Sequence, residues 1–348
     1  MNPYVLTLSM SSLGLGTTLT FASSHWLLAW MGLEINTLAI IPMMAKHHHP
    51  RAVEATTKYF LIQATAAAMI LFASTMNAWL TGEWNIYCLT NPITVNMTLM
   101  ALALKMGLAP MHLWLPEVLQ GLDLVTGMVL STWQKLAPFV LLIQISHAVK
   151  PELLMFLGVM STLIGGWGGM NQTQLRKILA YSSIAHLGWM IIILQYSPQL
   201  STLTLIMYIF MTTTTFMIFK MNSTTNINSL ALTWSNNPIT MMMIATTLLS
   251  LGGLPPLTGF MPKWFILQEL TKQGLSVTAT IMALSALLSL YFYLRLCYST
   301  ALTTSPNVSN STTPWRLNKV YMTMPLALLM TLTTTLLPIT PAMLALMY

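Results

Sequence analysis

Long apolar segments separated by short polar connections run along the whole of this sequence. Each is close to the length, roughly 20 residues, that an α-helix needs to cross the hydrocarbon core of a bilayer. The pattern predicts an all-α polytopic membrane protein with about eleven transmembrane helices. These are expected at 3–22, 25–45, 52–80, 93–119, 124–146, 152–170, 175–196, 200–220, 238–272, 276–299 and 322–346.

The composition excludes an ordinary soluble protein. Of the 348 residues, 55% are hydrophobic and only 6% are charged, whereas a typical soluble domain has about 25% charged residues. A net charge of +7 would suggest nucleic-acid binding in a soluble protein. In a membrane protein it is better explained by basic loops gathered on one side. We therefore expect contact with membrane lipids and no nucleic-acid partner.

Two of the predicted helices, 93–119 and 238–272, are too long for one plain helix, and both contain glycine and proline. Their interruptions read GLAPMHLWLP (107–116) and GLPPLTGFMP (253–262). The two segments share Gly-Leu-x-Pro followed by a second proline, at an offset of 146 residues. We treat each as one discontinuous helix that crosses the membrane once.

The offset between the interruptions predicts an internal repeat. Residues 1–150 and 151–299 each hold five predicted helices, so the offset matches one five-helix unit. A unit with an odd number of crossings must enter the membrane from the opposite side when it is repeated. We predict two inverted five-helix repeats with one discontinuous helix in each. A loop and a final helix in 300–348 complete a single membrane domain.

The distribution of basic residues supports this topology. With eleven crossings, one side of the membrane receives eight basic residues in its loops, and the other side receives Lys150 and Lys272. The eight are Lys46, Arg51, Arg176, Lys177, Lys220, Arg295, Arg316 and Lys319. The positive-inside rule predicts such an asymmetry. It would shrink if either discontinuous helix were re-entrant.

Four ionisable residues fall inside predicted helices: Glu34, Lys105, Lys135 and Lys263. The first three lie roughly 14–17 Å deep, near the middle of a bilayer core about 30 Å thick. Each charge there costs about 2.5–3.5 kcal/mol on the insertion scale, so we expect all four to face the protein interior. Either Glu34 neutralises one lysine and the group pins helices together, or the residues line a hydrated proton path. Three lysines outnumber one carboxylate, which favours the path.

Lysine suits a proton path because burial disfavours its charged form and a nearby carboxylate favours it. A change in the distance between Glu34 and Lys105 would therefore make the lysine hold or release a proton. His112 and His186 also lie inside predicted helices, and histidine titrates near neutral pH. For each histidine a proton-relay role and a structural hydrogen bond remain open.

Other motifs favour structural roles. Glu54 and Lys58 form an i,i+4 pair expected at the membrane interface, and the GGWGG segment (165–169) is expected to pack helices. Residues 47–49 (HHH) are more typical of a solvated turn than of a metal site. The sequence has only two cysteines and no haem-attachment motif or P-loop. We therefore expect this chain to bind no cofactor and no metal.

The segments LKMGLAPMHLWLPEVLQG, SLGGLPPLTGFMPKW and YSSIAHLGWM resemble the antiporter-like subunits of respiratory complex I. The resemblance covers the whole chain and implies a proton-translocating subunit. It implies a relay of Glu34 with Lys105, a bridging Lys135 and a terminal Lys263, with the two histidines along a connecting aqueous axis. Bacterial members of this family carry three further N-terminal helices, which puts in doubt partner contacts inferred from them on that flank.

The resemblance also implies the surroundings of the chain. It places the chain in the mitochondrial inner membrane, with its basic side facing the matrix, among other membrane-arm subunits that include further antiporter-like chains. NADH, FMN, iron–sulfur clusters and ubiquinone are implied on other subunits, whose redox chemistry drives translocation. Two alternative functions stay open: a free-standing cation/proton antiporter, and a structural assembly scaffold of the membrane arm.

Overall fold

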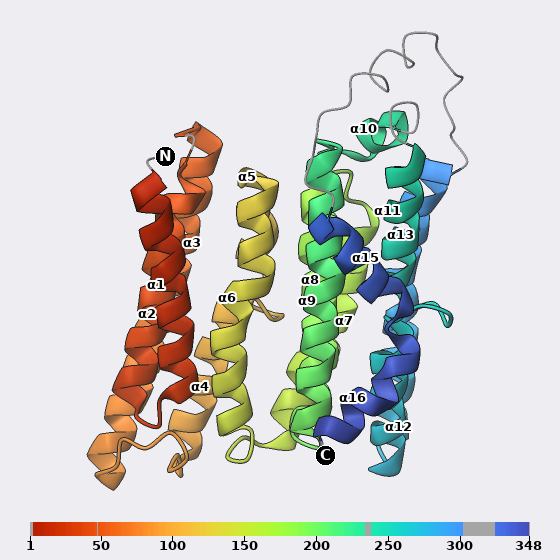
Figure 1. Cartoon of the computed structure of the whole chain (residues 1–348). Coiled ribbons are helices and arrows are strands. Elements are labelled where there is room, and N and C mark those ends of the chain that lie inside the picture. Colours follow the sequence, from red (N-terminus) through yellow and green to blue (C-terminus); the bar gives the residue numbers. More distant parts are fainter. Residues whose placement is uncertain (1–2, 47, 234–237, 302–323, 348) are drawn as a thin grey trace. The chain divides into compact units, whose positions relative to one another are not determined.

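The chain is helical almost throughout its described part, and contains there no β-strand beyond two isolated bridges (Figure 1). The computed structural model describes residues 3–46, 48–233, 238–301 and 324–347. The chain divides into two compact units, Met1–Leu157 (unit 1) and Gly158–Tyr348 (unit 2). Each unit is described by itself.

Unit 1 is built from six helices and the start of a seventh. They are α1 (Pro3–Ala22), α2 (Trp26–Met44), α3 (Pro50–Thr81), α4 (Pro92–Met106), α5 (Trp114–Gly121), α6 (Leu124–Ile145) and α7 (Pro151–Met170). Unit 2 takes the rest of α7 and the elements that follow it. They are α8 (Leu175–Ile193), α9 (Pro198–Met221), α10 (Ile227–Leu232), α11 (Pro238–Gly252), α12 (Phe260–Lys272), α13 (Ser276–Ala301), α15 (Met324–Thr335), a 3₁₀ turn (Leu337–Ile339) and α16 (Thr340–Met347).

Within the described residues, seven helices are long and apolar enough to cross a membrane, and the bent pair at the end of the chain would make an eighth. Helices α4 and α11 are apolar but shorter. The predicted all-α membrane class is therefore confirmed, while the count of eleven crossings stays a prediction. The short α10 was not predicted; its N-cap residue is Asn226, which forms a capping box with Ser229.

Both predicted interruptions are present. Residues 107–113 separate α4 from α5, and residues 253–259 separate α11 from α12. Each gap starts with a glycine in the left-handed region, Gly107 at φ 78° and Gly253 at φ 80°. A residue with a Cβ is strained in this region, so glycine is the usual residue for ending a helix in this way.

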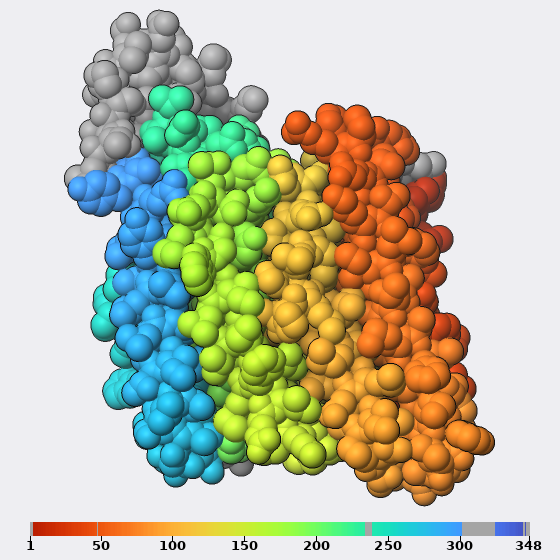
Figure 2. All heavy atoms as spheres, turned by 180° about the vertical axis from the view of Figure 1, so that it is seen from behind, coloured from red at the N-terminus to blue at the C-terminus, as the bar shows by residue number. Residues whose placement is uncertain are grey.

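The GGWGG segment packs α7 against its neighbours in unit 2, as the sequence predicts. A Cβ on Gly165 would lie 2.7 Å from the backbone nitrogen of Ala185 on α8, and one on Gly169 would lie 2.9 Å from the ring of Phe292 on α13. Figure 2 shows α7 (yellow-green) beside α13 (blue). Glycine therefore allows the close approach of these helices. Trp167, between the glycine pairs, is 73% exposed.

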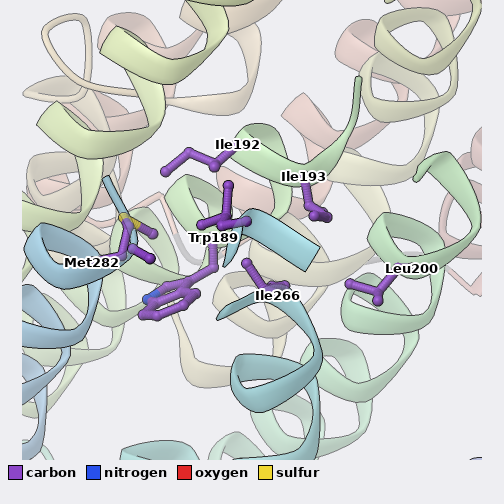
Figure 3. Close-up of a cluster of buried hydrophobic side chains, with 8 residues drawn as sticks. Trp189, Ile192, Ile193, Leu200, Ile266 and Met282 are labelled. Atoms are coloured by element: carbon purple, nitrogen blue, oxygen red, sulfur yellow. The ribbon is translucent and has the colours of Figure 1, made fainter. Parts of the chain in front are cut away.

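A cluster of buried apolar side chains joins four helices of unit 2 (Figure 3). Its members are Trp189, Ile192 and Ile193 from α8, Leu200 from α9, Ile266 and Leu270 from α12, and Ala279 and Met282 from α13. Lipid tails are as apolar as these side chains, so the cluster is stabilised by close van der Waals packing more than by exclusion of water. The cluster holds α12 in place one turn beyond Lys263.

The final helix differs from the prediction of one continuous segment over 322–346. Residues 322 and 323 lie outside the described part, and the remainder is bent by 64° between α15 and the helical residues from Leu337 onward. Pro338 lies at this bend. Proline has no N–H to donate and its ring clashes with the preceding turn, which breaks the helix. The predicted loop of residues 300–319, with Arg316 and Lys319, falls almost entirely outside the described residues.

We predict that Gly165→Ala destabilises the protein by about 1–3 kcal/mol, because the added methyl group would meet backbone atoms of α8 that cannot move alone. The thermal midpoint of the detergent-purified protein measures this loss. Gly14→Ala is the matched control, since no heavy atom lies within 4 Å of the position of its Cβ. An equal fall in both variants would contradict the packing role of Gly165.

Candidate functional site

Lys105 lies in the last turn of α4, directly before the first interruption. The carbonyl groups released by the interruption are bonded by neighbouring groups. Trp114 Nε1 donates to the carbonyl oxygen of Leu104 at 3.0 Å, and Gln63 Nε2 on α3 donates to that of Lys105 at 3.5 Å. Gly107 N also donates to the carbonyl oxygen of Ala103 at 3.0 Å. These hydrogen bonds satisfy carbonyl groups at the end of α4 that would otherwise be unpaired in apolar surroundings.

The side chain of Lys105 is buried, with 7% of the residue exposed. Its Nζ has no hydrogen-bond partner among the described residues. No ion pair within 4.0 Å joins it to Glu34 in the described part of the chain; the charge of Glu34 acts on Lys105 and Tyr59 through space. The Glu34 carboxylate instead accepts a hydrogen bond from Thr37 Oγ1 at 3.4 Å. The predicted pair, Glu34 and Lys105, therefore interacts through space and makes no direct contact.

A cavity of about 20 Å³ in unit 1 brings Lys105 and Lys135 together. This volume is enough to hold at least one water molecule. Lys135, on α6, is 3% exposed. The polar residues that also line the cavity are Asn36, Thr37, Tyr59, Gln63 and Gln134. Two of the three predicted relay lysines therefore share one small cavity lined by both polar and apolar side chains.

The amide residues of this cavity were not singled out from the sequence. Gln134 Nε2 donates to the carbonyl oxygen of Asn36 at 3.1 Å and so joins α6 to α2. Asn36 is 2% exposed, and its side-chain oxygen and nitrogen have no hydrogen-bond partner among the described residues. Their positions in the sequence could have identified them. Asn36 lies two residues after Glu34, and Gln134 lies directly before Lys135, each in the same apolar helix as its charged neighbour.

His112 lies in the first interruption and is 7% exposed. Its Nδ1 is 3.2 Å from the carbonyl oxygen of Pro110. It is not among the residues that line the cavity with Lys105 and Lys135. This geometry fits a structural hydrogen bond at least as well as a relay role.

The site in unit 2 is centred on Lys263, in the first turn of α12. The residue is half-buried, and its Nζ donates a hydrogen bond to the carbonyl oxygen of Gly252, the last residue of α11, at 2.8 Å. Lys263 and His186 line a second cavity of about 20 Å³ together with Thr204 and several apolar residues. The ring of His186 packs against that of Tyr208, with 5.7 Å between centroids.

The counterpart of Lys263 under the 146-residue offset, Glu117, has a different environment. Lys58 lies 2.7 Å from Glu54 and 3.0 Å from Glu117, and the three side chains are 42%, 63% and 55% exposed respectively. The predicted i,i+4 pair is confirmed. Such exposed ion pairs contribute about 0–1 kcal/mol each. Glu117 therefore joins α5 to α3 at the surface and is not part of the buried lysine cavity.

No group of three or more His, Cys, Asp or Glu side chains in the described residues is arranged to hold a metal ion. His47 lies outside the described part, whereas His49 precedes α3 and its Nδ1 accepts a hydrogen bond from Arg51 N at 3.3 Å. Both cavities place lysine amines next to a space large enough for water. Such a set can take up and release protons.

Comparisons with known proteins agree with this chemistry. Residues 23–289 match the family described as NADH:quinone oxidoreductase/Mrp antiporter, transmembrane, and residues 290–344 match the NADH dehydrogenase subunit 2 C-terminus. The NADH-ubiquinone oxidoreductase chain 2 of Carassius auratus is 70% identical over 346 residues, which is 99% of each chain. That of Squalus acanthias is 64% identical over 341 residues, 98% of each chain.

Solved structures show the same fold. A chain of respiratory complex I from Thermus thermophilus has a TM-score of 0.83 at 25% identity, covering 96% of this chain and 80% of that one. A chain of the Mrp complex from Dietzia sp. has a TM-score of 0.82 at 14% identity, covering 96% and 75%. The resemblance to the antiporter-like subunits is confirmed. The chain belongs to the NADH-ubiquinone oxidoreductase chain 2 family, within the broader NADH:quinone oxidoreductase/Mrp antiporter family.

Proposed function

We propose that this chain translocates protons as a membrane subunit of NADH:ubiquinone oxidoreductase in the mitochondrial inner membrane. The family membership along the whole chain supports the complex. The observation that carries the proton role is Lys105, a buried lysine whose amine has no hydrogen-bond partner in the described part and which shares a water-sized cavity with Lys135. A purely structural lysine would be expected to have a paired amine.

In unit 1 the proton passes between Lys105 and Lys135 through water in their shared cavity. The Glu34 carboxylate favours the charged form of Lys105, because opposite charges attract strongly where the dielectric constant is low. Neutralising Glu34, or moving it away, makes Lys105 a better proton donor. A signal from neighbouring subunits that acts on Glu34 therefore changes which lysine holds the proton.

In unit 2 Lys263 is the proton carrier and His186 is an accessory group. Both line the same cavity, and the hydrogen bond from Lys263 to the Gly252 carbonyl oxygen holds the amine at the end of α11. An imidazole near neutral pH can accept a proton from a neighbouring amine or water and pass it on. A relay role is less well supported for His112 than for His186, because His112 Nδ1 lies 3.2 Å from the Pro110 carbonyl oxygen.

We further infer eleven crossings, with two inverted five-helix repeats over 1–150 and 151–299. The left-handed glycines that open both interruptions, 146 residues apart, support this repeat. The redox chemistry resides on other subunits, with NADH, FMN, iron–sulfur clusters and ubiquinone, and this chain binds none of them. Its partners are other membrane-arm subunits, including further antiporter-like chains, and membrane lipids.

A free-standing cation/proton antiporter is the second candidate, because the matching family also includes Mrp antiporters. A cation site needs a buried carboxylate in addition to Glu34, and the candidate, Glu117, is exposed and paired with Lys58. Sodium-dependent transport by the isolated chain would favour this candidate. The third alternative, an assembly scaffold, is separated from the proton role by the variants below.

Lys105→Met is expected to slow proton transfer through unit 1 about 100-fold, because it removes the only carrier at the end of α4. Protons moved per NADH oxidised in sealed vesicles containing the assembled complex measure the effect. Lys58→Met, which removes an exposed lysine from an ion pair, is the control and should leave the ratio unchanged. An unchanged ratio in assembled Lys105→Met would support the scaffold.

Lys263→Met is expected to lower the same proton-to-NADH ratio, because methionine fills the space of the lysine but carries no proton. The matched control on the same helix is Lys272→Met, since Lys272 is 61% exposed and lies 3.5 Å from Glu269. Complex content is compared by native gel before each measurement. A ratio that falls equally in both variants would contradict a specific role for Lys263.

A further inference from the structure

At the C-terminal end of α11, a backbone carbonyl group accepts a hydrogen bond from an ionisable side chain. Gly253 N donates to the carbonyl oxygens of Leu249 at 3.1 Å and Ser250 at 3.0 Å, which closes the last turn of α11. The carbonyl oxygen of Gly252 accepts instead from Lys263 Nζ at 2.8 Å. The carbonyl end of a helix carries partial negative charge, so it stabilises a cation more than a neutral amine.

Gly253 supplies the space for this contact. A Cβ at this position would lie 3.0 Å from both Nζ and Cδ of Lys263 and 3.2 Å from its Cε. These separations are tighter than ordinary contacts, so a Cβ here would make the lysine side chain shift by a few tenths of an ångström and would strain its hydrogen bond to the Gly252 carbonyl oxygen. Glycine is therefore favoured both by its φ of 80° and by the lysine beside it.

Unit 1 contains the same backbone turn without a titratable side chain against it. Gly107 has a φ of 78°, and Gly107 N donates to the carbonyl oxygen of Ala103 at 3.0 Å. A Cβ on Gly107 would lie 2.8 Å from Cδ1 of Leu115, an apolar group. The uncharged Trp114 Nε1 bonds the Leu104 carbonyl oxygen. The two glycines thus share their conformation and differ in whether a lysine lies against them.

We propose that the Gly252–Gly253 turn positions Lys263 and sets how firmly it holds its proton, with Gly253 as a positioning residue for proton transfer. The Gly252 carbonyl oxygen holds the protonated amine. When the ammonium gives its proton to water or to the His186 imidazole in the shared cavity, the neutral amine is bound more weakly at the helix end. The inference rests on the proposed proton-carrying function of Lys263.

The other groups around the cavity do not compete with this effect. His186 on α8 is the titratable side chain that lines it with Lys263, while α9 contributes Thr204 and Met211. Helix α13 also packs on α12 but contributes no residue to the described lining. No acidic residue is present in that lining, and the acceptor bonded to the amine is the Gly252 carbonyl oxygen.

The test compares Gly253→Ala with Gly274→Ala in the assembled complex. Both variants place a Cβ in the left-handed conformation, at φ 80° and 74°, and no heavy atom lies within 4 Å of the Cβ position at Gly274. Protons moved per NADH oxidised are measured against pH in sealed vesicles. We expect Gly253→Ala to move the alkaline limb of this profile about one pH unit lower, the size of effect typical of a lost hydrogen bond to a charged group. Gly274→Ala should leave the limb in place. A limb that stays in place in Gly253→Ala, or moves equally in both, overturns the inference.

If the alanine variants do not assemble, Gly253→Asn and Gly274→Asn replace them. Asparagine enters the left-handed region more readily than other residues with a Cβ, so the strain is smaller while the Lys263 amine is still displaced. The same limb shift, confined to Gly253→Asn, is expected. Failure of the proposed function gives a different result, since Lys263→Met would then keep the full proton-to-NADH ratio whatever the glycine variants do.

Discussion

A polar group inside an apolar medium must find its hydrogen-bond partner within the protein, and the local structure of this chain follows from that constraint. Many threonine and serine residues on its helices meet it by donating to the carbonyl group three or four residues earlier, as Thr98 does to Val95 and Ser182 to Leu179. Lys105 and Asn36 have no such partner in the described part, and both line the unit 1 cavity. That cavity has room for a water molecule, which would satisfy both groups.

The two interruptions satisfy this constraint in different ways. Each releases carbonyl groups at the end of a helix, and each closes the last turn with a left-handed glycine. In unit 1 the donors to the released oxygens, Trp114 and Gln63, stay uncharged. In unit 2 the donor is Lys263, an ionisable side chain. The same backbone problem is therefore solved by uncharged donors in one unit and by an ionisable amine in the other.

The sequence predicts the helices and both interruptions because hydrophobic period, glycine and proline act locally. It also identifies Lys105 and Lys135 as buried, since a charged side chain within an apolar segment is expected to face the protein interior. Three features were out of reach because they depend on how helices meet. Gln134 reaches the backbone of Asn36 on another helix, Glu34 bonds Thr37 instead of Lys105, and Lys263 bonds a carbonyl group eleven residues away. The bend at Pro338 was missed because the apolar pattern continues on both sides of it.

The bent final helix braces the second interruption. Thr258 Oγ1, five residues before Lys263, donates to the carbonyl oxygen of Thr333 on α15 at 2.6 Å, and both residues are 1% exposed. Thr333 belongs to the segment matched by the subunit 2 C-terminus family, whereas Thr258 belongs to the segment matched by the broader antiporter family. The hydrogen bond therefore ties the loop before Lys263 to the C-terminal segment, so the parts of the chain matched by the two families meet at the second interruption.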